Sequence, residues 1–218
     1  MQVAIGLYPG FTALDAIGPY QVFTNVPGLD VVVCAEKRGP LPDDNGLLHF
    51  QIDHTFDDVP SPDVLLVPGG TITRLLARPG EPIVEWIRRA HPTTTWTTSV
   101  CTGALLLGAA GILDGLRATT HWVAYDALAS FGATPTEQRV VVEGKIVTGA
   151  GVSAGIDLAL MLTDTVFGPQ VAQAVQLGLE YDPQPVHDAG APSKADPDIV
   201  ELVRSVMRAE EAALAESR

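Results

Sequence analysis

The chain has 218 residues, enough for one buried core and short of the length at which chains usually divide into two domains. Hydrophobic residues make up 46% of the chain and charged residues 18%, which excludes an intrinsically disordered protein. The formal net charge of −13 opposes contact with phosphate groups, so neither nucleic acid nor an anionic membrane is an expected partner.

Apolar runs and helix-like segments alternate from the first residue, which is typical of a parallel sheet covered by helices. In chain order, the pattern predicts a strand at 2–7, a helix at 15–24, a strand at 30–35, antiparallel pieces at 47–52, a strand at 64–67, a helix at 82–90, a strand at 94–100, a helix at 102–110, a hairpin at 139–148, and helices at 153–167, 171–179 and 196–215. The segment 182–196, rich in Pro, Gly and Ala, is expected to be an irregular connection. We therefore expect residues 1–218 to form a single domain, a three-layer α/β/α sandwich with a flavodoxin-like, mostly parallel sheet.

Cys101 follows the β-branched strand TTTWTTSV directly and precedes the small, aliphatic helix TGALLLGAA. Such a junction is a nucleophile elbow, which presents its side chain at the carboxyl edge of the sheet where open α/β folds bind ligands. A helix N-terminus also favours a thiolate and lowers the pKa of the thiol. The alternative is a buried structural cysteine. The position favours a nucleophile, whereas Cys34, inside the apolar strand VVVCA, is expected only to pack.

Two further segments end at the same edge of the predicted sheet. Asp15 follows the first strand and its loop, so its carboxylate can reach the space above Cys101, although by local sequence alone it reads better as a helix N-cap. The turn VPGG ends a buried strand at Gly70 and can aim a backbone N–H at a developing anion, with the N–H of Thr102 as the second donor. Taken alone, VPGG reads as a tight turn.

Other motifs give weaker alternatives. The stretch GVSAG around Ser153, with Asp182 and His187 following, matches the order of an α/β-hydrolase triad but lies in the wrong structural context. The match GAGVSA to a dinucleotide-binding pattern lacks the acidic residue expected further along. His121 is a candidate accessory residue that either assists Cys101 or caps a helix beginning near residue 122, and both remain open.

The sequence also indicates where the protein works. The first residues lack the basic start and long apolar run of a signal peptide, and the apolar runs are too short to span a bilayer. Two cysteines provide no disulfide framework, and the five histidines are scattered without metal-ligand spacing. We expect a cytoplasmic protein with free thiols and no metal.

The segment SVCTGALLLGAAGILDGLRATTHW at 99–122 resembles the DJ-1/PfpI superfamily (ThiJ/PfpI, class I glutamine amidotransferase-like), and within it the isocyanide hydratase branch. The resemblance extends to LYPGFTALDAIGPYQVF near the start, to VPGG, to TGAGVSAGIDLAL from residue 148 and to QLGLEYDPQPVHDAGAP from residue 176. These segments cover most of the first 195 residues in the family's order.

The resemblance implies that Cys101 is the nucleophile, that Asp15 is its acidic partner and that Thr102 belongs to the catalytic set. The backbone near Ala150 would help to position Asp15. Hydratases of this branch often have glycine where this chain has Ala150 and isoleucine where it has Val152, differences that bear on substrate fit.

The implied reaction adds water to an isocyanide through a thioimidate on Cys101 and gives an N-substituted formamide, with no cofactor. The implied assembly is a homodimer that acts on a small molecule. Two alternatives remain: glyoxalase or deglycase chemistry, and a non-enzymatic amidase-like sensor domain. The chain ends in a single acidic helix without a following helix-turn-helix, which favours an enzyme over a sensor.

Overall fold

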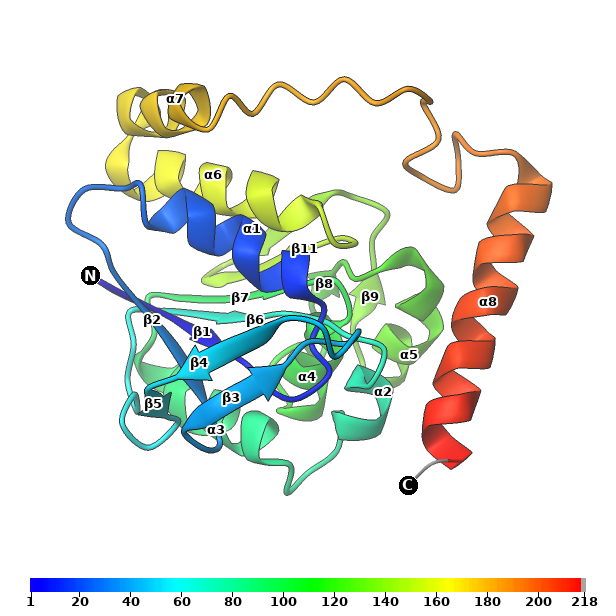
Figure 1. Ribbon diagram of the computed structural model, residues 1–218, viewed down its shortest axis with the longest axis horizontal. Helices are drawn as coiled ribbons and strands as arrows, with labels where there is room; N and C mark the ends of the chain where they lie inside the picture. Colours follow the sequence, from blue (N-terminus) through cyan, green and yellow to red (C-terminus); the bar gives the residue numbers. More distant parts are fainter. Residues whose placement is uncertain (217–218) are drawn as a thin grey trace.

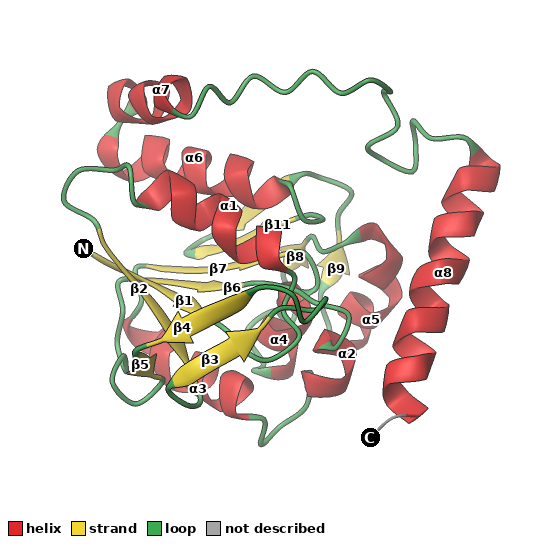
Figure 2. Ribbon diagram, viewed as in Figure 1, coloured by secondary structure: helices red, strands yellow, loops and turns green. Residues whose placement is uncertain are grey.

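A seven-stranded sheet forms the centre of the molecule in the computed structural model, which describes residues 1–216 (Figures 1 and 2). The strands lie in the order β10 (Val140–Glu143), β11 (Ile146–Gly149), β7 (Trp96–Val100), β6 (Val64–Val67), β1 (Gln2–Gly6), β2 (Asp30–Ala35) and β5 (His54–Thr55). Every neighbouring pair is parallel except β10 and β11, which form the predicted hairpin.

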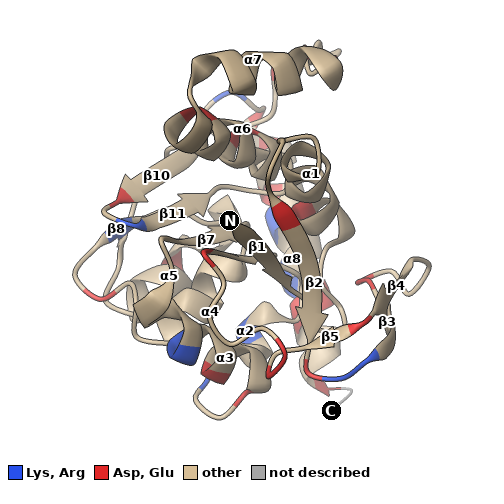
Figure 3. Ribbon diagram, turned by 90° about the vertical axis from the view of Figure 1, so that its left-hand side faces the viewer, with Lys and Arg blue, Asp and Glu red and all other residues tan. Residues whose placement is uncertain are grey.

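Helices cover both faces of this sheet (Figure 3). One face carries α1 (Ala13–Phe23) and α6 (Ala154–Phe167), and α7 (Pro169–Gly178) packs on α6. The other face carries α2 (Thr73–Leu76), α3 (Pro82–Ala90), α4 (Gly103–Ala109) and α5 (Tyr125–Ser130). The three-layer α/β/α sandwich predicted from the sequence is therefore confirmed.

Several short elements escaped prediction. They are the strand β3 (Gly39–Pro42) that pairs with β4 (His49–Ile52), the edge strand β5, the parallel pair β8 (Arg117–Ala118) and β9 (Thr134–Pro135), the 3-10 turn η1 (His91–Thr93), and helix α2. The helix expected to begin near residue 122 is the 3-10 turn η2 (Trp122–Ala124), which runs directly into α5. Antiparallel pieces were expected only at 47–52, which overlaps β4. Elements of two to six residues carry too little hydrophobic periodicity to be recognised in a sequence.

The order of the parallel strands decides where a site can form. Taken in chain order, β1, β2, β6, β7 and β11 lie in space as β2, β1, β6, β7, β11, which is the flavodoxin-like arrangement. The chain reverses its direction of winding between β1 and β6, and a crevice opens outside the carboxyl ends of the strands at such a point. The loops after β1, β6 and β7 all meet there.

Glycine lets α4 approach the end of β6 closely. A Cβ atom on Gly103 would stand 2.8 Å from the carbonyl oxygen of Pro68 and closer still to that of Val67. Both neighbours are backbone atoms and cannot turn away. Behind this contact α4 buries a run of three leucines completely, Leu105, Leu106 and Leu107, each of which stabilises the fold by about 1.5–3 kcal/mol.

The C-terminal helix α8 (Pro197–Glu216) lies beside α5 and α2, at the end of the mostly exposed connection 180–196 (Figure 1). None of its described residues is buried. It is held to the rest of the molecule by an ion pair between Arg74 and Glu211 at 2.9 Å and by Arg204, whose guanidinium lies 5.0 Å from the centre of the Trp122 ring. Among residues 1–216, no helix is both long enough and apolar enough to cross a membrane.

The close contact at Gly103 predicts opposite effects for two glycine substitutions. Gly103→Ala should lower the free energy of unfolding by about 1–3 kcal/mol, because the added methyl group meets backbone that must move. Gly178→Ala, at the end of α7 with nothing within 4 Å of the added carbon, should raise it by up to about 1 kcal/mol. Urea unfolding of both variants checks this, and equal stabilities would contradict it.

Candidate active site

Cys101 occupies a strained turn between β7 and α4. Its φ angle is 56°, in the left-handed region that non-glycine residues rarely adopt. The turn is held from both sides, because the Cys101 N–H donates to the carbonyl oxygens of Gly149 and Ala150 at 3.1 and 2.9 Å, and its own carbonyl accepts from Oγ1 of Thr120 at 2.9 Å. The residue is 5% exposed. This is the geometry of a nucleophile elbow.

Asp15 lies within α1 and does not cap it, since the N-cap position belongs to Thr12. The side chain is completely buried, and its Oδ2 accepts the backbone N–H of Gly69 at 2.8 Å. Its Oδ1 has no hydrogen-bond partner of ordinary geometry among the described residues, while the carboxyl group as a whole interacts with the Cys101 thiol. The structure therefore brings together the acid and the thiol that the sequence placed on one sheet edge.

Burial dominates the electrostatics of this pair. It raises the pKa of Asp15 from 3.8 to about 7, against the lowering effect of the Gly69 N–H and the Cys101 thiol. Burial, together with the negative charge of Asp15, also raises the pKa of the Cys101 thiol, while the N–H groups of Val152 and Thr102 act to lower it. From the sequence, the helix N-terminus was expected to lower the pKa of the Cys101 thiol. This expectation is wrong, because burial and the charge of Asp15 outweigh the N–H groups and raise that pKa. Below about pH 7 both groups are protonated, and above it the carboxyl group ionises while the thiol keeps its proton.

The turn after β6 does not direct the Gly70 N–H at the reacting sulfur, as the sequence had led us to expect. The N–H of Gly70 donates to Oγ1 of Thr102 at 3.0 Å, and the same hydroxyl donates to the Gly70 carbonyl at 3.1 Å. Gly70 is therefore engaged with Thr102 and does not offer its N–H to the sulfur, which corrects its expected role as an anion donor. Gly69 has no room for a side chain, because a Cβ would lie 2.6 Å from the Thr102 nitrogen and 2.9 Å from Asp15 Oδ2.

Ala150 also takes a different position from the one that the resemblance implied. Its carbonyl holds the Cys101 N–H, and its N–H donates to the carbonyl of Arg139 at 2.9 Å. No hydrogen bond joins it to Asp15 among the described residues, so it positions the thiol and not the acid. Two residues on, Val152 adopts a φ of 26° and turns its N–H toward the Cys101 sulfur.

His121 takes the capping role, one of the two that were left open. Its Nδ1 accepts the N–H of Val123 at 3.4 Å at the start of η2. No hydrogen bond to Cys101 is found in residues 1–216, and burial lowers the pKa of the imidazole. The ring packs beside Gly151, where a Cβ would stand 2.6 Å from it.

The alternative hydrolase triad does not assemble. Oγ of Ser153 accepts a hydrogen bond from Arg139 at 3.1 Å. Asp182 accepts one from Gln184, and His187 is exposed on the connection to α8. Cys34 is fully buried in β2, where burial raises the pKa of its thiol to about 12. Within residues 1–216, no group of three or more His, Cys, Asp or Glu side chains is arranged to hold a metal ion.

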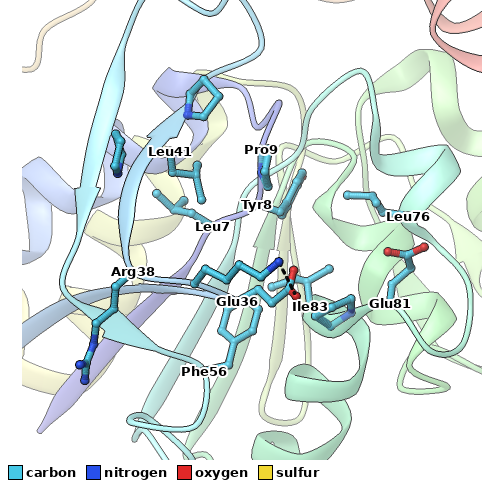
Figure 4. Close-up of a pocket in the computed structure, with 14 residues that line it drawn as sticks. Leu7, Tyr8, Pro9, Glu36, Arg38, Leu41, Phe56, Leu76, Glu81 and Ile83 are labelled. Atoms are coloured by element: carbon cyan, nitrogen blue, oxygen red, sulfur yellow. Dashed lines mark ion pairs between the residues drawn. The ribbon is translucent and has the colours of Figure 1, made fainter. Parts of the chain in front are cut away.

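Tyr8 is a site residue that was not singled out in the sequence. Its hydroxyl donates to the Pro68 carbonyl at 2.7 Å. Burial is the main cause that raises the pKa of Tyr8, and the negative charges of Asp15 and Cys101 raise it further. On its other side Tyr8 lines a hollow of about 460 Å³, together with Leu7, Leu41, Phe56 and Ile83 (Figure 4). Tyr8 therefore separates this hollow from the reactive pair. Its place directly after β1 was the available signal.

A larger groove of about 700 Å³ lies on the other side of the site. Its inner wall includes Ala150 and Val152, which contact Cys101, and its outer wall is the connection at 190–193 with residues of α8. A molecule bound in this groove lies against the backbone that holds the thiol.

Comparison with known proteins agrees with this geometry. The model of the DJ-1/PfpI family matches residues 1–165. An isonitrile hydratase from Pseudomonas putida is 41% identical over 204 residues, covering 94% of this chain and 89% of the relative. An HTH-type transcriptional regulator, CdhR, from Pseudomonas aeruginosa is 31% identical over 78% of this chain, which spans 52% of the regulator. The crystal structure of a ThiJ/PfpI family protein from Pseudomonas syringae superposes with a TM-score of 0.89 at 37% identity, covering 97% of this chain and 89% of that one. The chain belongs to the DJ-1/PfpI family.

Proposed function

We propose that this chain is an isocyanide hydratase, an enzyme that adds water to an isocyanide and releases an N-substituted formamide. The observation that carries the proposal is the buried Asp15 carboxyl beside the Cys101 thiol, in an elbow at the switch point of the sheet. The likeness to the isonitrile hydratase of Pseudomonas putida over 94% of the chain supports the choice of substrate.

The reaction divides into two additions. In the first, the Cys101 sulfur bonds to the terminal carbon of R–NC while its proton passes to Asp15 and on to that carbon, giving the thioimidate R–N=CH–S–Cys101. In the second, Asp15 orients a water that adds to the same carbon, the C–S bond breaks, and the thiol recovers its proton as R–NH–CHO leaves. Covalent catalysis of this kind replaces one difficult hydration by two easier steps. No step calls for a cofactor.

The backbone supplies the remaining assistance. The N–H groups of Thr102 and Val152 stabilise negative charge on the sulfur, and the Thr102 hydroxyl ties the turn at Gly70 to the elbow. Gly69 keeps Asp15 turned toward the thiol. Ala150 holds the backbone of Cys101, and His121 lines the groove while capping η2.

Two other functions are distinguished by direct assay. Glyoxalase or deglycase chemistry would appear as turnover of methylglyoxal, measured beside an alkyl isocyanide. A non-enzymatic sensor role would leave both substrates unchanged. The one relative reported above as a regulator is longer, with this chain spanning 52% of it.

We further propose that residues 1–218 act as one domain in a cytoplasmic homodimer. Apolar side chains on α7 and α8 that are open to solvent support a second copy as partner: Leu177 is 81% exposed, Leu202 57% and Ile199 51%. Covering such side chains is the usual driving force for association.

Cys101→Ala should abolish isocyanide turnover, because no thioimidate can form without the sulfur. Cys34→Ala, which removes the other thiol from the core, should retain it. Initial rates with an alkyl isocyanide, and the mass of the adduct trapped on each variant, measure the difference. Turnover that survives in Cys101→Ala would require another nucleophile.

Asp15→Asn should slow turnover by about 10²–10⁴-fold, the usual loss when general acid–base assistance is removed. The amide oxygen can still accept the Gly69 N–H, so the unfolding midpoint should change little.

The pH dependence of kcat/KM tests the same role. In the parent enzyme, kcat/KM should rise with pH through about 7, because below that pKa both Asp15 and Cys101 are protonated and no base is present. In Asp15→Asn the rising limb should move to higher pH, since the thiol must then ionise alone and burial raises its pKa. An unchanged limb would assign the proton transfer to another group.

The homodimer predicts a solution mass of twice the 23.0 kDa chain. Light scattering measures it directly. Leu177→Glu together with Leu202→Glu should shift the mass toward that of one chain, because burying a carboxylate in an interface is unfavourable. A monomeric parent protein would contradict the proposal.

A further inference from the structure

The groove beside Cys101 is closed on its outer side by α8. Arg204 and Arg208, one helical turn apart on this helix, both line the groove. The opposite wall carries Ala150 and Val152, whose backbone groups bond to Cys101. A substituent that extends from the sulfur past Ala150 and Val152 enters this groove and meets the two arginines.

Arg208 stands apart from the other cations of this protein. The sequence has 26 acidic residues for 13 Lys and Arg, so partners for a cation are plentiful. Within residues 1–216, every other Lys and Arg forms an ion pair or a hydrogen bond, whereas Arg208 forms neither. A guanidinium left without a carboxylate in so acidic a chain points to an anion that binds from outside.

Arg204 is fixed where it can share that anion. Its guanidinium lies 5.0 Å from the centre of the Trp122 ring, and its contact with Glu201 is long, at 3.6 Å. Like charges four residues apart destabilise a helix, and a bound anion between Arg204 and Arg208 would offset that repulsion.

The acidic residues near the groove do not neutralise this pair. Glu211, three residues after Arg208, is bound to Arg74, and so is Asp126 on the groove wall. Glu137 also lines the groove, and it forms no ion pair with either arginine among the described residues. Arg208 therefore lines the groove as an exposed guanidinium without an ion pair, and the contact of Arg204 with Glu201 is its one ion pair among the described residues.

We propose that Arg204 and Arg208 form a subsite for a carboxylate on the substrate, so that the preferred substrates are isocyanides whose substituent carries a carboxylate. Two adjacent guanidinium groups can bind both carboxylate oxygens. That the substrate is an isocyanide rests on the proposed hydratase activity. That Arg204 and Arg208 bind a carboxylate does not depend on that activity.

Turnover of matched substrates tests the substrate class. Isocyanoacetate and 4-isocyanobutyrate are compared with their primary amides, which differ in charge and little in shape. At least one carboxylate should exceed its amide in kcat/KM, and Arg208→Gln should reduce that ratio by about tenfold to a hundredfold, the range expected for a lost charge-assisted hydrogen bond. Arg208→Glu should invert the preference.

Arg88→Gln is the matched control. It removes the same charge from α3, where Arg88 pairs with Glu85, and should leave the ratio unchanged. An equal fall in Arg88→Gln and Arg208→Gln would show only the effect of net charge and would overturn the subsite.

Binding measured without chemistry separates the two proposals. Calorimetry compares N-formylglycine and N-formyl-4-aminobutyrate with their amides on the parent protein and on Arg208→Gln. Carboxylate-dependent binding that is lost in Arg208→Gln supports the subsite, even if no isocyanide is turned over and the proposed function fails. Turnover of neutral isocyanides with no carboxylate preference in either measurement would overturn the subsite and leave the hydratase standing.

Discussion

The hydrogen bond from the Gly69 N–H to Oδ2 of Asp15 is the contact on which the site depends. The carboxyl group that accepts it is completely buried, and the bond holds this group beside the Cys101 thiol. Burial raises the pKa of Asp15 from 3.8 to about 7 in spite of this bond, so the folded site favours the protonated carboxyl group by about 4 kcal/mol relative to water. Because the folded state binds this proton more tightly than the unfolded state, the protein loses stability as the pH rises from 3.8 toward 7. A carboxyl group with a pKa of about 7 can both accept and release a proton near neutral pH.

The lack of side chains at the turn after β6 makes this arrangement possible. A Cβ on Gly69 would collide with Thr102 and approach Asp15, and a Cβ on Gly103 would collide with the end of β6. The elbow at Cys101, the turn at Gly69 and the start of α4 therefore fit together only as a unit. The strained φ of 56° at Cys101 is maintained by the hydrogen bond that its N–H donates to Gly149 of β11 and by the one that its carbonyl accepts from Thr120, both in other parts of the chain.

The net negative charge of the molecule repels the carboxylate-bearing substrates that we propose for its groove. A chain with net charge −13 repels anions in general, so an anionic substrate needs a local cation that the protein does not itself neutralise. Arg208 meets that requirement through the placement of α8, which the mostly exposed segment 180–196 joins to α7. The proposed substrate preference thus depends on α8, which lies outside the sandwich, while the chemistry depends on Cys101 and Asp15 at the edge of the sheet.

The sequence by itself determined the sandwich, the hairpin and the long helices, and it placed Asp15 and Cys101 at one edge of the sheet, because hydrophobic period and the carboxyl-edge rule depend only on local pattern and strand order. Local pattern favoured Asp15 as a helix N-cap, and its pairing with Cys101 came from the family resemblance. The sequence missed α2, η1 and the short strands β3, β5, β8 and β9, which are too brief to show a period. Only the tertiary structure decided that Gly70 bonds to Thr102, that Ala150 holds Cys101 and that His121 caps η2, since the direction of an N–H depends on backbone angles that many sequences share. It also decided the sign of the thiol's pKa change: the pull of a helix N-terminus can be read from sequence, but the burial that outweighs it comes from residues far apart in the chain.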